Sequence, residues 1–220
     1  YRCGISLSDE MLEKETLEII FNGINYKADI WFNGVKVGNI AGAFIRGRFD
    51  ITPLAKPENQ LYVHIYPPAN PGIPHEQSPS AGGGKNGGAM CLDGPTFFCS
   101  EGWDWIPGVR DRNIGIWQDV QLLATDGIAF SDTKVVTDLP LPDVSYADIT
   151  VTAYLKNSLD VDKKVVVSGT TDGIEFLAEA VVPAKSQIPV EIKGIRMDNP
   201  RLWMPNGYGE PNLYDMTLEC

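Results

Sequence analysis

The chain has 220 residues, of which 43% are apolar and 21% are charged, and its formal net charge is −11 at pH 7. Its length allows one or two domains with ordinary hydrophobic cores. The scattered lysines and arginines do not form the basic stripe that nucleic-acid binding needs, and no apolar run approaches the roughly 20 residues of a membrane helix. We therefore expect a soluble protein that neither binds nucleic acid nor spans a membrane.

Strand patterns dominate the first half of the chain, because apolar residues alternate with polar ones over short runs. The expected strands lie at 17–21, 28–32, 44–51, 61–66 and 114–123. Asn22-Gly23 and Asn33-Gly34 follow two of these runs, and Asn-Gly is typical of hairpin turns in which both central residues take positive φ. Only residues 8–15 could hold a helical turn.

The amino-acid composition changes at Thr125-Asp126-Gly127, beyond which aromatic residues are rarer and valine, threonine and aspartate are more common. Beyond this turn, short strand patterns recur with turn signals between them, as in antiparallel sandwiches. We place a domain boundary here, which gives domains at 1–125 and 126–220. The sequence therefore predicts an all-β protein made of two β-sandwiches in tandem.

A long segment at 67–102 differs from the strands around it, because it contains eight glycines and six prolines. Loops of this length are usually functional or disordered, so it is either a mobile surface loop or a lid over a substrate. Gly84-Lys85 does not belong to a phosphate-binding loop, since Pro79 and Asn86 replace the glycine and the hydroxyl residue that such a loop needs. We expect no cofactor.

The cysteines and histidines do not indicate a metal site, because there are only two histidines and no C-x-x-C spacing. The four cysteines are Cys3, Cys91, Cys99 and Cys220. Cys91 and Cys99 could meet across a loop, but spacing alone does not establish a disulfide bond.

The strongest candidates for a functional site lie between positions 99 and 120, where three of the five tryptophans occur. Tryptophan rings fit the apolar faces of sugars, and a carboxylate can accept hydrogen bonds from two hydroxyl groups. The candidates for sugar contact are Trp103, Asp104 and Trp105. Alternatively, Arg110, Asp111 and Arg112 form an ion-pair network that holds the loop. Trp117 lies in an expected strand, which favours packing in a core or a domain interface.

Several motifs together resemble glycoside hydrolase family 2, in the branch of the β-mannosidases and exo-β-glucosaminidases. They follow the order of the family and cover nearly the whole chain. They are Gly-Trp-Asp-Trp at 102–105 with Pro107, Asp-Arg-Asn-x-Gly-Ile-Trp-x-Asp-Val at 111–120, and the segments 23–34, 49–54, 59–63 and 200–214. The resemblance implies a jelly-roll, galactose-binding-like sandwich at 1–125 and an immunoglobulin-like sandwich at 126–220.

In this family a catalytic (β/α)₈ barrel follows these two domains and carries both catalytic glutamates. Nothing in the chain matches those motifs, so the resemblance implies no catalytic residue here. Tyr1 and Cys220 resemble positions within strands, so we expect a non-catalytic N-terminal part of a longer retaining β-glycosidase, without the first strands of its jelly roll. Its partners would be the barrel of the same parent chain and a carbohydrate.

The resemblance also implies roles for the loop residues. Asp104 would bind hydroxyl groups of the terminal sugar, and Trp103 or Trp105 would line the pocket that holds this sugar. Arg110, Asp111, Arg112 and Trp117 would support the loop. Ile106 replaces a glycine of the β-mannosidase pattern, and residues 111–113 are closer to the exo-glucosaminidase form, so the sugar is either neutral or an amino sugar.

Two other hypotheses stay open at this point. The chain could be a free-standing carbohydrate-binding or cell-surface adhesion module, or a purely structural spacer. For the glycosidase hypothesis, the enzyme class suggests a periplasmic or secreted protein.

Overall fold

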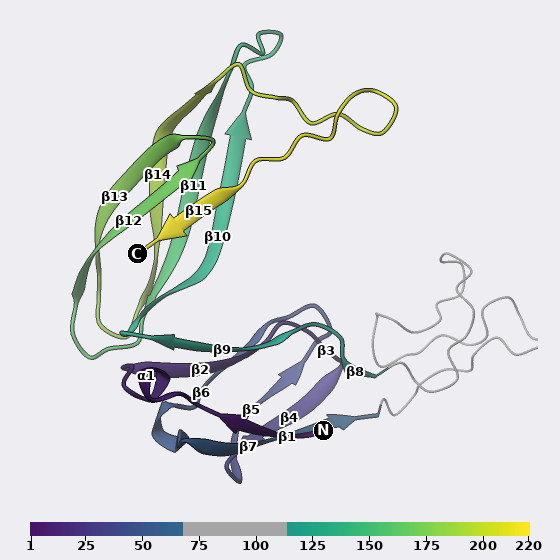
Figure 1. The fold of residues 1–220 in the computed structure, drawn as a ribbon, viewed down its shortest axis with the longest axis vertical. Coiled ribbons are helices and arrows are strands. Elements are labelled where there is room, and N and C mark those ends of the chain that lie inside the picture. Colours follow the sequence, from purple (N-terminus) through teal and green to yellow (C-terminus); the bar gives the residue numbers. More distant parts are fainter. Residues whose placement is uncertain (68–113) are drawn as a thin grey trace, which may run out of the picture. The chain divides into compact units, whose positions relative to one another are not determined.

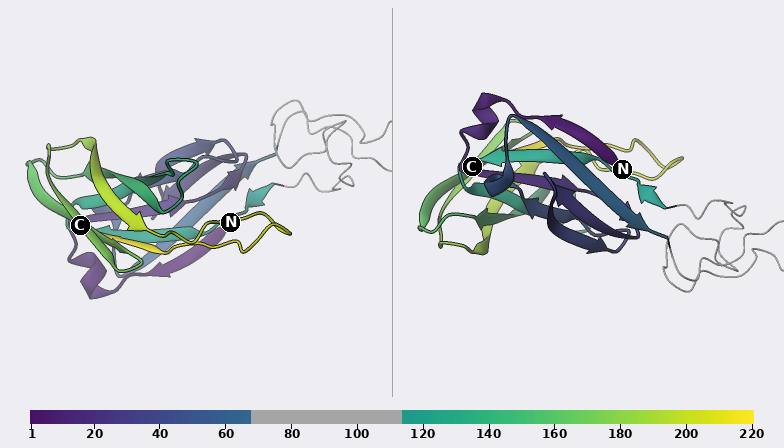
Figure 2. Two further views of the ribbon diagram at one scale, coloured as in Figure 1. Left: turned by 90° about the horizontal axis from the view of Figure 1, so that it is seen from above. Right: turned by 90° about the horizontal axis from the view of Figure 1, so that it is seen from below.

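The computed structural model describes residues 1–67 and 114–220, and the chain divides into two compact units, Tyr1–Ala124 and Thr125–Cys220. In the described residues of both units, the regular structure is almost entirely antiparallel strands (Figure 1). The predicted all-β fold class is therefore confirmed. Helical structure among the described residues is limited to one α-helical turn, α1 (Asp9–Leu12), seen in purple in Figure 2, and one 3₁₀ turn, η1 (Thr52–Leu54).

Unit 1 contains a four-stranded sheet, a three-stranded sheet and a two-stranded pair. The four-stranded sheet has the order β1 (Arg2–Ser6), β7 (Glu58–Tyr66), β4 (Lys27–Phe32) and β5 (Val35–Ala41). The three-stranded sheet has the order β6 (Gly47–Asp50), β2 (Thr16–Phe21) and β9 (Val120–Thr125). The short strands β3 (Ile24–Asn25) and β8 (Gly115–Ile116) form the pair.

The core of unit 1 takes its side chains from both larger sheets, as period-2 alternation predicts. Along β4, Ala28, Ile30 and Phe32 are fully buried, whereas the residues between them are not. From the other sheet, Ile19 and Phe21 join the same cluster. Burial of each large side chain contributes about 1.5–3 kcal/mol, so this alternation fixes which face of each strand points inward.

Unit 2 consists of two three-stranded sheets with longer and more regular strands. One sheet has the order β10 (Ile128–Asp138), β11 (Tyr146–Asn157) and β14 (Gln187–Asp198). The other has the order β13 (Ile174–Val182), β12 (Lys163–Thr171) and β15 (Met216–Glu219). The inward residues of β11 from Ala147 to Leu155 are small or aliphatic, and the strand ends in the buried Asn157. The core they join is rich in valine and isoleucine.

The turn predictions had different outcomes. At Asn33-Gly34 the φ angles are 50° and 83°, and the residues join β4 to β5 in a hairpin, as predicted. Asn22-Gly23 does not form a hairpin, because β2 and β3 belong to different sheets. Gly23 is required for another reason: the indole Nε1 of Trp117 lies 2.6 Å from the position that a Cβ at residue 23 would occupy.

Candidate functional site

Six of the seven side chains predicted to contact sugar or to support the loop lie outside the described residues. They are Trp103, Asp104, Trp105, Arg110, Asp111 and Arg112. Cys91 and Cys99 lie outside them as well. The structure therefore describes the strand ends that flank residues 68–113, and among the predicted site residues it describes Trp117.

Four stretches of chain meet at one end of unit 1, which we call the loop end: residues 23–27, 41–45, 66–67 and 114–117. Lys27 pairs with Tyr66 on one side and with Ala41 on the other, and Asn25 pairs with Gly115. The backbone N–H of Gly42 donates to the carbonyl oxygen of Tyr26 at 2.9 Å. The residues that flank 68–113 on both sides therefore lie at the same end of unit 1.

Trp117 fixes the returning strand to the turn that follows β5. Its indole Nε1–H donates to the carbonyl oxygen of Ala43 at 2.9 Å, and its backbone N–H donates to Gly23 O at 3.1 Å. The ring also meets Phe44 edge to face, with centroids 5.7 Å apart and an interplanar angle of 88°. Trp117 is 40% exposed, so of the two expected positions a core is excluded, and packing in a domain interface stays a prediction.

The turn at 42–46 places two large apolar side chains in solvent, since Phe44 is 66% exposed and Ile45 is 49% exposed. We predicted a strand from residue 44, but the strand begins at Gly47. The reason lies in contacts with distant residues: Gly42 and Ala43 are held by hydrogen bonds with Tyr26 and Trp117 rather than by the β6 ladder, and Ala43 is buried. The chain therefore turns before it can pair.

A row of side chains crosses the outer face of the four-stranded sheet. Tyr66 stacks on His64 with a centroid distance of 4.4 Å, and His64 lies 6.5 Å from Trp31 with an interplanar angle of 22°. Lys27 Nζ lies 5.5 Å from the Tyr66 ring, and Lys36 Nζ lies 5.7 Å from the Trp31 ring. The ring faces in this row are thus already covered by one another and by two cations.

Asp29 ties this row together, because its carboxylate accepts hydrogen bonds from Lys36 Nζ and from Tyr66 Oη, each at 2.8 Å. The bond from Lys36 is the main reason why the pKa of Asp29 lies below its ordinary value, and the bond from Tyr66 adds to it. The same contact raises the pKa of Tyr66. Sequence alone could not place this network, since it depends on the register that sets Asp29 opposite His64.

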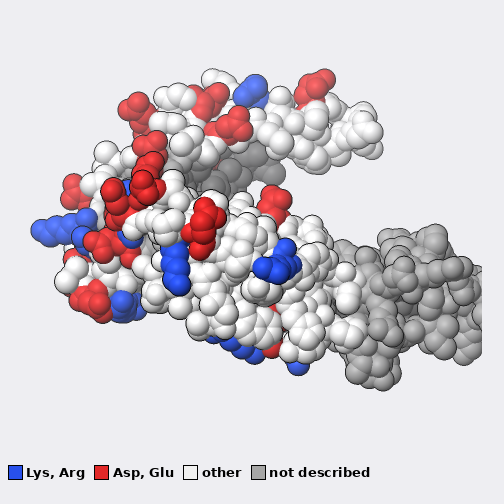
Figure 3. Space-filling model, turned by 60° about the horizontal axis from the view of Figure 1, so that its bottom comes forward, with Lys and Arg blue, Asp and Glu red and all other residues white. Residues whose placement is uncertain are grey.

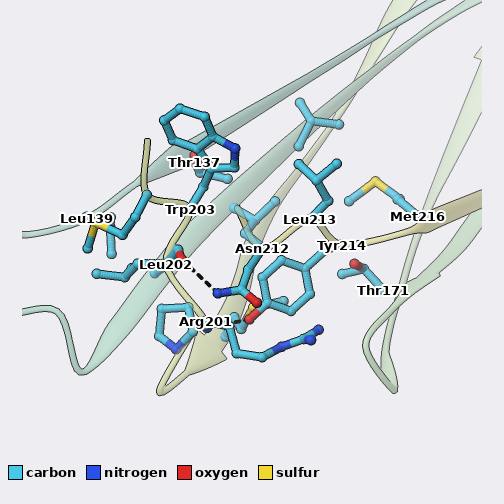
Figure 4. Close-up of a pocket in the computed structure, with 16 residues that line it drawn as sticks. Thr137, Leu139, Thr171, Arg201, Leu202, Trp203, Asn212, Leu213, Tyr214 and Met216 are labelled. Atoms are coloured by element: carbon cyan, nitrogen blue, oxygen red, sulfur yellow. Dashed lines mark hydrogen bonds between the residues drawn. The ribbon is translucent and has the colours of Figure 1, made fainter. Parts of the chain in front are cut away.

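Residues 200–214 of unit 2 form one wall of a pocket of about 550 Å³ whose other walls come from β10, β11, β12, β14 and β15 (Figure 4). The Asn212 side chain donates to Leu202 O at 2.9 Å, shown as the dashed line in Figure 4. The Arg201 guanidinium lies over the Tyr214 ring, 4.7 Å from its centroid. These polar groups hold the segment together, and most of the other residues that line the pocket are apolar.

Residues 1–118 match the family "glycosyl hydrolase 2 galactose-binding domain-like", and residues 128–220 match the family "glycosyl hydrolases family 2". The chain belongs to glycoside hydrolase family 2. The motif-based assignment to this family is confirmed. The expected domain order, a galactose-binding-like sandwich followed by a second β-sandwich, is confirmed as well.

Several family 2 proteins are similar over nearly the whole chain. It is 30% identical to the mannosylglycoprotein endo-β-mannosidase of Lilium longiflorum over 97% of this chain and 23% of that protein. It is 28% identical to the exo-β-D-glucosaminidase of Streptomyces avermitilis over 91% of this chain and 20% of that protein. The chain therefore spans a quarter or less of the length of these relatives.

Solved structures of family 2 proteins share the fold. The exo-β-D-glucosaminidase CsxA superimposes with a TM-score of 0.78 at 25% identity, over 100% of this chain and 23% of that chain. The β-D-mannosidase of Dictyoglomus thermophilum superimposes with a TM-score of 0.69 at 24% identity, over 99% of this chain and 26% of that chain.

Other classes of site find no support in the described parts of this family 2 chain. On the face that Figure 3 shows, lysines and arginines are scattered among acidic residues without forming a basic stripe. Within residues 1–67 and 114–220, no group of three His, Cys, Asp or Glu side chains could hold a metal ion. No helix in these ranges is long and apolar enough to cross a membrane.

Proposed function

We propose that this chain is the non-catalytic N-terminal part of a longer retaining β-glycosidase that acts on β-mannosides or β-glucosaminides. The observation that carries the proposal is that both domain matches occur in family order, while the chain spans only a quarter or less of relatives with those activities. The proposed domains are 1–125 and 126–220. In this proposal, two glutamates on a barrel elsewhere in the parent protein perform the hydrolysis.

The role of this part is to support the barrel and to supply one rim of the sugar pocket. Asp104 would accept hydrogen bonds from sugar hydroxyl groups, and Trp103 and Trp105 would cover the apolar face of the ring. Arg110, Asp111 and Arg112 would hold the loop by ion pairs. This placement is supported by the loop end, because the segment that carries these residues starts and finishes there.

Trp117 would anchor the chain just after the C-terminal end of the segment 68–113. Its contacts with Gly23, Ala43 and Phe44 connect the chain after β8 to two turns of the described fold. The anchor makes the returning strand rigid, and a rigid base is what positions a binding loop. We further propose a periplasmic or secreted location, in keeping with an enzyme of glycan breakdown.

The test compares the isolated 220-residue chain with the longer protein on nitrophenyl β-mannoside and nitrophenyl β-glucosaminide. We expect the longer protein to hydrolyse at least one of them and the isolated chain to hydrolyse neither. A longer protein that hydrolyses neither substrate would contradict the proposal. Submillimolar binding of glycans by the isolated chain would instead favour a free-standing carbohydrate-binding module.

A further inference from the structure

We infer that unit 2 binds one further β-strand of the longer protein, which pairs with β15 and covers the second half of β10. The residues joined directly to Cys220 supply this strand. The inference rests on the proposed function in one respect, namely that the chain is part of a longer protein.

The first argument is that the inward face of β10 is exposed along its second half. Val135 lies opposite Val151, and Thr137 lies opposite Ile149, so each pair shares the face that points into the sandwich. Val151 and Ile149 are at most 5% exposed. Val135, by contrast, is 46% exposed, and Thr137 is exposed as well. The second sheet therefore covers β11 but leaves this part of β10 open.

The second argument is the position of β15. β13 and β14 contact each other at one side of the two sheets, so β10 and β15 end their sheets on the other side. Among the described strands, β15 pairs with β12 alone. An edge strand presents N–H and C=O groups with which a further strand can pair. Such a strand would extend the second sheet by about 4.8 Å and face β10 across the usual distance of about 10 Å between packed sheets.

The pocket of Figure 4 lies along the same open face. Val135 and Thr137 line it from β10, and Met216 lines it from β15. Trp203 and Leu213, which also line it, are 57% and 80% exposed. Apolar side chains in such an open pocket are stabilised when apolar groups replace the water beside them. The bound strand should therefore carry apolar side chains at alternate positions, which is the pattern of a strand with one buried face.

The residues joined to Cys220 have the shortest path to this face. β15 runs from Met216, at the pocket, to Glu219. A short turn after Cys220 would send the chain back antiparallel to β15 and toward the pocket, as in a hairpin. At about 3.4 Å per residue, a strand of roughly five to seven residues is long enough to cover β10 from Thr133 to Thr137. A strand joined by a short turn also has a much higher effective concentration than a separate partner.

The first test places aspartate at Val135 or at Val136, in the longer protein and in the 220-residue chain. The two valines are 46% and 45% exposed but lie on opposite faces of β10, so each variant is the control for the other. In the longer protein, amide hydrogen exchange in β11 should be roughly 10-fold or more faster in Val135→Asp than in Val136→Asp, because the bound strand would bury the carboxylate. In the 220-residue chain, the two variants should differ by less than about 3-fold, since water reaches both positions.

The second test extends the 220-residue chain by about 20 residues of the longer protein, enough for a turn and a strand but too few for a barrel. Amide exchange in residues 216–219 should be slower by about 10-fold or more than in the 220-residue chain, because backbone hydrogen bonds form along the open edge of β15. The longer protein should show the same protection.

Equal effects of the two aspartate variants in the longer protein would overturn the inference, and so would unchanged exchange in residues 216–219 of the extended chain. Protection in the longer protein without protection in the extended chain would contradict it too, because a more distant segment would then be the occupant. Protection that rises with concentration in the 220-residue chain would identify a second copy as the occupant instead. A longer protein that hydrolyses neither nitrophenyl glycoside would contradict the proposed function but not these exchange results, so the two failures can be told apart.

Discussion

The two units of this chain use the same kind of strand in different ways. Unit 2 is regular: β11 and β14 each have 12 residues, and their inward side chains are mostly small and aliphatic. Unit 1 has shorter strands, two fully buried phenylalanines, and a buried ion pair between Glu18 and Arg48. Two aromatic rings at its loop end, Phe44 and Trp117, are also partly exposed. In the proposed function, the predicted sugar contacts belong to the irregular unit.

The largest difference in stability should come from the cores. Phe21→Ala should destabilise unit 1 by about 3–5 kcal/mol, because it removes a fully buried ring and leaves a cavity. Val151→Ala in the core of unit 2 should cost only about 1–3 kcal/mol, since it removes two methyl groups. Hydrogen exchange read by mass spectrometry follows each unit separately. Equal losses of stability in the two variants would contradict the proposed difference between the two cores.

The ion pairs offer a second comparison. Arg48 donates to the carboxylate of Glu18, and these side chains are only 18% and 8% exposed. Glu18→Gln should destabilise unit 1 by about 1–3 kcal/mol, because a buried charge-assisted hydrogen bond is weakened.

The matched variant in unit 2 is Glu191→Gln, whose partner Lys193 is 2.8 Å away, with both side chains at least half exposed. It should change the free energy of unfolding by less than about 1 kcal/mol. Urea titration of both variants measures this difference. A cost in unit 2 as large as that in unit 1 would show that burial does not set the strength of these pairs.

The anchor at the loop end should have a smaller and more local effect. Trp117→Phe keeps an aromatic ring but removes the N–H that donates to Ala43 O, which should cost about 0.5–1.5 kcal/mol. Hydrogen exchange should become faster in residues 41–45 and 114–117. Trp203→Phe in unit 2 is the control and should leave exchange in these residues unchanged. Unchanged exchange in Trp117→Phe would remove the anchoring role.

The smallest expected effect is the pH dependence contributed by Asp29. Its pKa is lowered in the folded protein, mainly by Lys36, so its contribution to stability is present above the ordinary value of 3.8 and is lost as the pH falls through the lowered folded value. Asp29→Asn should therefore flatten the loss of stability of unit 1 below about pH 4. Urea titrations at several pH values test this. Asp160→Asn, at an exposed pair with Lys185 in unit 2, is the control.

Much of the fold could be predicted because the alternation of apolar and polar residues along a strand reflects which side chains are buried. The runs at 28–32 and 61–66 became β4 and β7 since one face of each must be apolar. The helical turn α1 lies within residues 8–15, the stretch that the sequence allowed for one, and the Ser8 hydroxyl oxygen caps it by accepting from Met11 N–H at 3.3 Å.

The errors occurred where distant parts of the chain decide the local structure. Residues 114–123 were expected to form one strand, but β8 and β9 are separate because Trp117 bonds to Gly23 and Asn22 N–H donates to Asp119 O at 3.1 Å. The same contacts explain why Asn22-Gly23 is no hairpin. The exposed position of Phe44 could not be predicted either, since it follows from the Trp117 ring reaching the turn that precedes β6.

The central claim is that residues 103–105 of this chain contact the sugar on which the longer protein acts. The most direct measurement is kcat/KM of Asp104→Ala in the longer protein on nitrophenyl glycosides, with Glu101→Ala, an acidic residue of the same stretch, as the control. Loss of hydrogen bonds to a carboxylate should lower kcat/KM by roughly 10- to 100-fold in Asp104→Ala and leave Glu101→Ala near the unmodified value. Unchanged kinetics in Asp104→Ala would contradict the claim.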